Sequence, residues 1–221
     1  MNELLWIGFA LINFGLVVLI YQFFGKTGLF AWITLAIILA NIQVTKNIEL
    51  FGFTATLGNI MYGTIFLITD TINEIFGVKD AKKAVLLGFS VMIVTLIIMQ
   101  TALLFTPTEW DEGHNALAYT FGLLPRIALG SVIAYLISQW FDVQFFDFLK
   151  RKNNPLWVRN NGSTLISQLI DTLIFVPIAF LGLYETSVIL EIAFTTYFIK
   201  VLVAAMDTPF IYLMKKITPR D

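Results

Sequence analysis

The sequence contains no cysteine and a single histidine, His114, among its 221 residues. Disulfide bonds and thiol chemistry are therefore excluded, and little remains from which a transition-metal site could be built. Charged residues are also scarce, at 13% of the chain, whereas a typical soluble domain has about 25%. Hydrophobic residues make up 58%. This composition is typical of a polytopic membrane protein.

Long apolar runs divide the chain into seven candidate membrane-spanning helices, since one crossing takes about 20 residues. Their approximate ranges are 4–24, 29–45, 57–77, 84–105, 121–149, 163–184 and 188–214. The run at 4–24 has no basic segment before it and no small-residue cleavage site after it, so we interpret it as a retained helix. The sequence thus predicts an all-α helical bundle in one transmembrane domain, residues 1–221. We expect residues 1–28 to form an extra N-terminal helix and residues 29–221 to form a six-helix core.

Basic residues gather in the turns after the first, third and fifth runs and at the C-terminus, and the opposite loops have almost none. The residues in this group are Lys26, Lys79, Lys82, Lys83, Lys150, Arg151, Lys152, Arg159, Lys215, Lys216 and Arg220. Lysine and arginine favour the cytoplasmic side of a membrane protein. We therefore expect a multi-pass protein of the cytoplasmic (inner) membrane, with its N-terminus outside and its C-terminus in the cytoplasm.

The third run carries polar and aromatic side chains at helical spacing, in a stretch otherwise apolar enough to cross a bilayer. The stripe consists of Asn59, Tyr62, Phe66, Asp70 and Asn73, with Glu74 beside it. Residues three and four apart share one face of a helix, and a charge at the centre of a membrane helix costs roughly 2.5–3.5 kcal/mol. We interpret this stripe as one wall of a solute site.

The sixth and seventh runs add a second set of polar residues. Gln168 and Asp171 share a face of the sixth run with Thr164. Asp171 is predicted near the middle of the membrane, which favours a functional role, whereas Gln168 is equally well explained by a hydrogen bond between helices. Lys200 in the seventh run is too deep to reach the membrane surface easily. We expect it to pair with Asp70, Glu74 or Asp171, either in the site or as a structural ion pair.

Other polar residues lie near helix ends, where structural explanations compete with functional ones. Arg126 could orient a solute or reach the membrane surface. Asn41 and Gln43 have amides suited to the edge of a heterocyclic base, or they could cap their own helix. Asp142 and Asp147 are close to a basic turn, so we expect local salt bridges there.

Five segments resemble the queuosine precursor transporter family, also called the vitamin uptake transporter family. They are ANIQVTKNIELFGF, TDTINEIFG, PRIALGSVIAYLISQWFDV, GSTLISQLIDTLIF and YFIKVL. The similarity covers about residues 40–214. It implies an inner-membrane importer of 7-cyano- or 7-aminomethyl-7-deazaguanine, with a six-helix core similar to the substrate-binding subunits of energy-coupling-factor transporters. Members are thought to work without the ATPase module, and the extra helix at 4–24 departs from the shorter members.

The resemblance and the polar pattern together give a predicted substrate site. It consists of Asn41, Gln43, Tyr62, Phe66, Asp70, Asn73, Glu74, Arg126, Gln168, Asp171 and Lys200. Carboxylates can accept hydrogen bonds from the ring N–H and amine of a guanine-like base, and amides can meet its carbonyl and ring nitrogens. An aromatic side chain, Tyr62 or Phe66, could stack on the ring.

Three hypotheses of function follow. The first is an importer that works by alternating access, either by facilitated diffusion or with proton coupling through Asp70 or Asp171. The second is the substrate-binding subunit of an ATP-driven energy-coupling-factor vitamin transporter. The third is a membrane hydrolase with an aspartyl dyad of Asp70 and Asp171. We expect the first, with a deazapurine and the lipid bilayer as partners, no nucleic acid and no cofactor. The sequence leaves a homodimer open.

Overall fold

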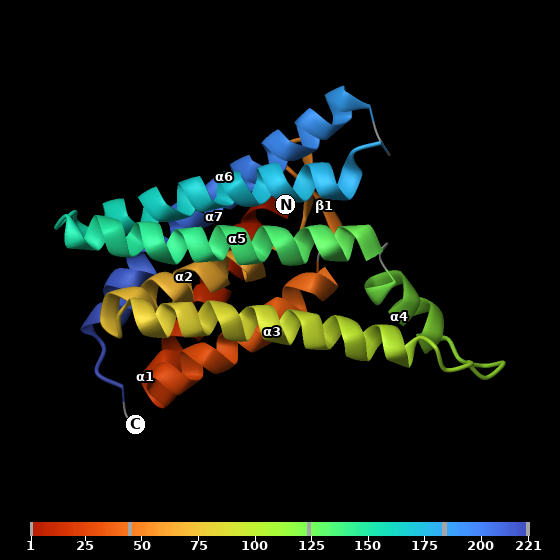
Figure 1. Ribbon diagram of the computed structural model, residues 1–221, viewed down its shortest axis with the longest axis horizontal. Helices are drawn as coiled ribbons and strands as arrows, with labels where there is room; N and C mark the ends of the chain where they lie inside the picture. Colours follow the sequence, from red (N-terminus) through yellow and green to blue (C-terminus); the bar gives the residue numbers. More distant parts are fainter. Residues whose placement is uncertain (1, 44–45, 123–124, 183–184, 220–221) are drawn as a thin grey trace.

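The computed structural model describes residues 2–43, 46–122, 125–182 and 185–219, and it is a helical bundle with one small hairpin (Figure 1). The elements are α1 (Asn2–Gln43), β1 (Asn47–Leu50), β2 (Phe53–Thr56), α2 (Asn59–Ile75), α3 (Val78–Ala102), α4 (Gly113–Phe121), α5 (Pro125–Arg151), α6 (Leu156–Phe180) and α7 (Thr186–Lys216). The predicted helical membrane bundle is confirmed. Within the described residues, α1, α3, α6 and α7 contain segments long and apolar enough to cross a membrane.

The long helix α1 consists of two limbs that fold back on each other at Gly25. This residue has φ 48° and ψ −136°, a conformation that glycine tolerates far better than other residues. The side-chain amide of Asn2 donates to the carbonyl oxygen of Glu49 at 3.1 Å, so the start of the first limb lies beside the segment that follows the second. The first two predicted runs, 4–24 and 29–45, are therefore the two antiparallel limbs of α1.

The turns rich in lysine and arginine meet at one end of the bundle, as the charge pattern predicts. The α2–α3 turn, the α5–α6 turn and the C-terminal end of α7 lie together at the left of Figure 1. An ion pair of 2.8 Å between Lys26 and Asp80 joins the turn of α1 to the start of α3. We call this end of the molecule the basic end.

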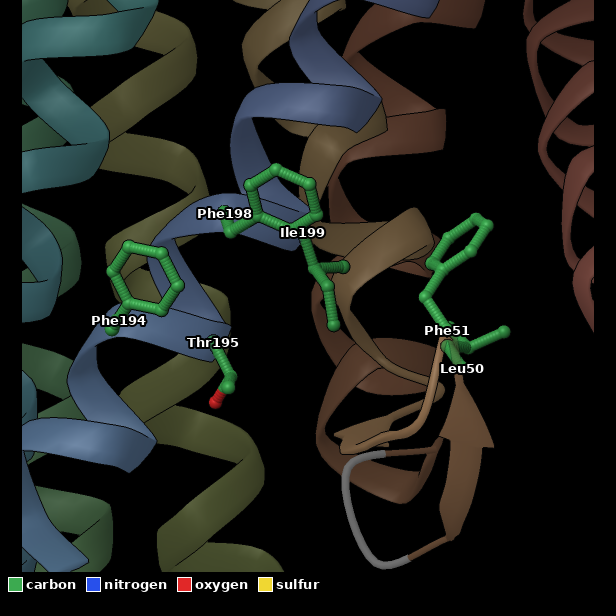
Figure 2. Close-up of a pocket in the computed structure, with 6 residues that line it drawn as sticks. All are labelled: Leu50, Phe51, Phe194, Thr195, Phe198 and Ile199. Atoms are coloured by element: carbon green, nitrogen blue, oxygen red, sulfur yellow. The ribbon is translucent and has the colours of Figure 1, made fainter.

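A β-hairpin that the sequence analysis did not predict lies between α1 and α2. Strands β1 and β2 pair antiparallel, with Asn47 opposite Thr56 and Leu50 opposite Phe53. Phe51 and Gly52 both have positive φ, 53° and 79°, as a two-residue hairpin turn requires. Figure 2 shows Leu50 and Phe51 of the hairpin beside α7, and both residues line a small crevice. The other residues of the crevice are Phe194, Thr195, Phe198 and Ile199.

Helix α2 lies at the centre of the fold and is buried on nearly all sides. Every residue from Ile60 to Asn73 except Tyr62 is buried. It packs against α1, α3, α5 and α7. A Cβ atom on Gly63 would lie 2.2 Å from Cγ1 of Val203, so α2 and α7 approach each other very closely there. Because α2 has protein around it, its polar side chains must face other helices rather than lipid.

Candidate functional site

The carboxylate of Asp171 in α6 is the meeting point of four helices. Its Oδ1 accepts a hydrogen bond of 2.7 Å from the hydroxyl of Tyr62 in α2 and one of 3.3 Å from Ser138 in α5. Its Oδ2 pairs with the ammonium of Lys200 in α7. The side chains of Asp171 and Lys200 are each only 6% exposed. We call Tyr62, Ser138, Asp171 and Lys200 the polar centre.

Aromatic rings form one side of the polar centre. The Nζ atom of Lys200 lies 5.0 Å from the centroid of the Tyr62 ring, within the range of a cation–π contact. The Tyr62 ring also makes edge contacts with Phe66 at 5.6 Å and with Tyr135 at 6.4 Å. The ammonium of Lys200 is therefore held by a carboxylate and a π face, which together offset the cost of burying its charge.

A second group, which we call the acid cluster, contains Asp70 of α2, Asp142 of α5 and Asp207 of α7. All three are at most 1% exposed, and their carboxyl groups are close enough to interact. The donors come from α6: Thr164 to Asp70 at 3.3 Å, Ser167 to Asp142 at 2.9 Å, and Asn160 to Asp207 at 2.8 Å. Among the described residues, the ion pairs involve none of these three carboxyl groups. Each of the three carboxyl groups also has one buried oxygen that has no hydrogen-bond partner among the described residues.

Glu74 lies at the basic end and holds three cations. Its carboxylate pairs with Arg159 at 2.9 Å, Lys215 at 2.6 Å and Lys150 at 3.7 Å. These residues come from α6, α7 and α5, so one side chain of α2 ties four helices together. The neighbouring Asn73 donates to the carbonyl oxygen of Val143 at 2.9 Å. Both of these predicted site residues thus connect helices outside the polar centre.

The remaining predicted residues lie outside the polar centre, one of them near it in α6 and the others at helix ends. Gln168 is 2% exposed and lies one turn of α6 before Asp171, with an Oε1 that has no partner among the described residues. Asn41 donates to the carbonyl oxygen of Ile37 in its own helix at 2.8 Å. Gln43 is the last residue of α1 and is half-buried. Arg126 falls in the first turn of α5, and its side chain lies outside the described residues.

Helix α5 contributes side chains that were not among the predicted site residues. The spacing of three or four residues places Tyr135, Ser138 and Asp142 on one face of the helix. This spacing alone indicates a polar stripe on α5. The local salt bridge predicted for Asp142 is wrong, because its carboxyl group is buried and accepts a hydrogen bond from Ser167. The one predicted for Asp147 is confirmed, since this residue pairs with Arg151 at 2.7 Å.

Asp70 and Asp171 belong to different clusters, and no hydrogen bond between them is found among the described residues. Their separation gives no support to an aspartyl dyad. The polar centre presents an acceptor, an ammonium donor and an aromatic face side by side, and these are the groups that recognise a nucleobase edge and ring.

Comparison with known proteins gives a consistent set of matches. A family model described as "Putative vitamin uptake transporter" matches residues 56–214. A "Probable queuosine precursor transporter" of Bacillus subtilis (strain 168) is 49% identical over 223 residues, covering 100% of this chain and 97% of the relative. The "Queuosine precursor transporter" of Escherichia coli (strain K12) is 34% identical over 174 residues, covering 77% of this chain and 76% of the relative. No solved structure matches the chain significantly.

Proposed function

The chain belongs to the vitamin uptake transporter family, and from this premise we propose that it imports a queuosine precursor across the cytoplasmic membrane. The substrates that we propose are 7-deazaguanine bases, namely 7-cyano- or 7-aminomethyl-7-deazaguanine. The names of two relatives support this proposal. So does a bundle with four helices that are long and apolar enough to span a membrane, counted within the described residues.

The observation that carries the proposal is the polar centre itself. An ion pair between Asp171 and Lys200 is buried among four helices, and burying charges is costly, which favours a functional role for the pair. The Asp171 carboxylate can accept from the ring N–H and exocyclic amine of a guanine-like base. Tyr62 and Phe66 offer aromatic surface to the ring. Gln168, one turn away, adds an amide oxygen that has no partner in the described structure.

We further propose alternating access between the two ends of the bundle. At the basic end, Glu74 and its three cations close the space between α2, α5, α6 and α7. At the other end, the β1–β2 hairpin lies against α7 near Ile199, the residue before Lys200 in the sequence (Figure 2). Opening toward the cytoplasm would separate Glu74 from its partners, while opening outward would move the hairpin.

Exchange in liposomes tests the function directly. The purified chain, reconstituted alone, should exchange a labelled 7-deazaguanine base, and the base should be recovered chemically unaltered. Asp171→Asn should abolish exchange, while Asp147→Asn, which alters only a surface pair, should leave exchange intact. A chain that exchanges no deazaguanine alone, but does so together with an ATPase pair, would support the energy-coupling-factor alternative instead.

The source of energy can be tested in the same system. Asp171 already has a cation partner, whereas Asp70 has none among the described residues, so we propose Asp70 as the proton carrier if uptake is proton-coupled. Accumulation driven by an imposed pH gradient, and lost in Asp70→Asn, would support this assignment. Uptake that is unaffected by pH and by an uncoupler would instead indicate facilitated diffusion.

The orientation is also accessible to experiment, because the sequence has no native cysteine. We propose that the basic end faces the cytoplasm. A single cysteine in place of Glu109, in the α3–α4 loop, should react with a membrane-impermeant reagent in intact spheroplasts. A single cysteine in place of Lys152, at the basic end, should react only after lysis.

A further inference from the structure

The two oxygens of the Asp171 carboxylate have different partners. Hydroxyl groups of Tyr62 and Ser138 donate to Oδ1, and the ammonium of Lys200 pairs with Oδ2. The negative charge is therefore already balanced by a buried positive charge. The polar centre therefore offers a ligand a dipole rather than a net charge, with one carboxylate acceptor directly beside one ammonium donor.

This acceptor–donor pair matches the edge of a 7-deazaguanine. In such a base the ring N–H lies next to the ring carbonyl, and the 7-substituent lies on the other side of that carbonyl. If Asp171 accepts from the ring N–H, then Lys200 is placed to donate to the carbonyl oxygen. The 7-substituent would then be the next ligand group within reach of the Lys200 ammonium.

We propose that Lys200 is a specificity-determining residue that favours a neutral, hydrogen-bond-accepting 7-substituent over a cationic one. The inference rests on the proposed function and names the 7-cyano base as the preferred substrate. An ammonium can only donate hydrogen bonds, so Lys200 can bond to a nitrile nitrogen. It repels the ammonium of a 7-aminomethyl group, and burial in a low-dielectric interior strengthens this repulsion.

The acid cluster is the feature that could produce the opposite preference. Asp70, Asp142 and Asp207 have no cation partner among the described residues and would attract a 7-aminomethyl group. However, their donors Thr164 and Ser167 precede Asp171 by one to two turns of α6. A base whose edge is held by Asp171 therefore meets Lys200 before it meets these acids.

Competition with the wild-type protein tests the inference without any substitution. Exchange of a labelled deazaguanine would be inhibited by the unlabelled 7-cyano base, the 7-aminomethyl base and the 7-hydroxymethyl base. The last is neutral but similar in size to the 7-aminomethyl base, so it separates charge from size. We expect the two neutral bases to compete at concentrations at least tenfold lower than the cationic base. Equal or stronger competition by the 7-aminomethyl base would overturn the inference alone. Failure to exchange any deazaguanine would overturn the proposed function and the inference with it.

Substitutions at Lys200 provide the second test. Lys200→Arg keeps the charge and should keep the preference, whereas Lys200→Met should reduce the ratio of the two inhibitory concentrations at least tenfold. Lys83→Met, at an exposed lysine of the basic end, is the matched control and should leave the ratio unchanged. Because a ratio does not depend on how much protein is folded, partial loss of stability does not affect this test. An unchanged ratio in Lys200→Met would overturn the assignment.

Discussion

From the buried ion pair between Asp171 and Lys200 we predict how substitutions at these residues change the free energy of unfolding. Asp171→Asn keeps an oxygen that can accept from Tyr62 and Ser138, but it leaves the Lys200 ammonium buried without an anion. Breaking a buried pair by removing one partner costs about 3–5 kcal/mol. Lys200→Met should cost a similar amount, because it leaves the carboxylate without a cation. The double variant removes both charges, so it should be destabilised by much less than the sum.

The measurement is a double-mutant cycle of unfolding free energies on the purified protein. We expect a coupling energy of at least about 2 kcal/mol, since residues in direct contact couple by 0.5–3 kcal/mol. The surface pair Asp147–Arg151, with the arginine 75% exposed, is the matched control and should couple by less than about 1 kcal/mol. Additivity within about 0.5 kcal/mol at Asp171 and Lys200 would refute the reasoning. The double variant should recover stability but not exchange.

Three further substitutions test the packing around the site, each by thermal unfolding in detergent. Gly63→Ala places a methyl group 2.2 Å from Cγ1 of Val203 and should destabilise the protein by about 1–3 kcal/mol. Adding Val203→Ala to the same chain should recover most of this loss. A single Gly63→Ala variant as stable as the wild type would contradict the close packing. Glu74→Gln removes the anion shared by three cations, one of them an arginine with a 10% exposed side chain, and should cost about 3 kcal/mol or more; a loss below about 1 kcal/mol would indicate a surface-like cluster. Gly25→Ala strains the fold of α1 at φ 48° and should cost about 1–3 kcal/mol, whereas Gly8→Ala, with open space around its Cβ position, should be neutral or stabilising.

Much of the architecture could be predicted because the bilayer restricts it strongly. Runs of about 20 apolar residues mark the helices, and lysine and arginine mark the turns that meet at the basic end. The acid Asp171 and the lysine Lys200 were identified for the same reason, since charges within apolar helices are expensive. Their pairing with each other was one of three alternatives, and the choice depends on helix rotations that local spacing does not determine.

The parts that sequence reasoning missed depend on contacts between distant segments. Glu74 lies one residue from the predicted stripe, but its partners come from three other helices. Ser138 carries no charge, so it gave no strong signal until the structure placed it against Asp171. The hairpin is a local element, and its strands are only four residues long on either side of the turn at Phe51 and Gly52.

The first limb of α1 has a practical consequence for anyone producing this protein. Its inner face packs on the rest of the bundle, with the ring of Phe14 5.2 Å from that of Phe210 in α7 and the ring of Tyr21 6.5 Å from that of Phe76. Shortening the chain to residues 29–221 would remove the first limb of α1 and expose the aromatic side chains that pack against it. Expression plasmids should therefore encode the first limb, and shortened versions should aggregate on extraction.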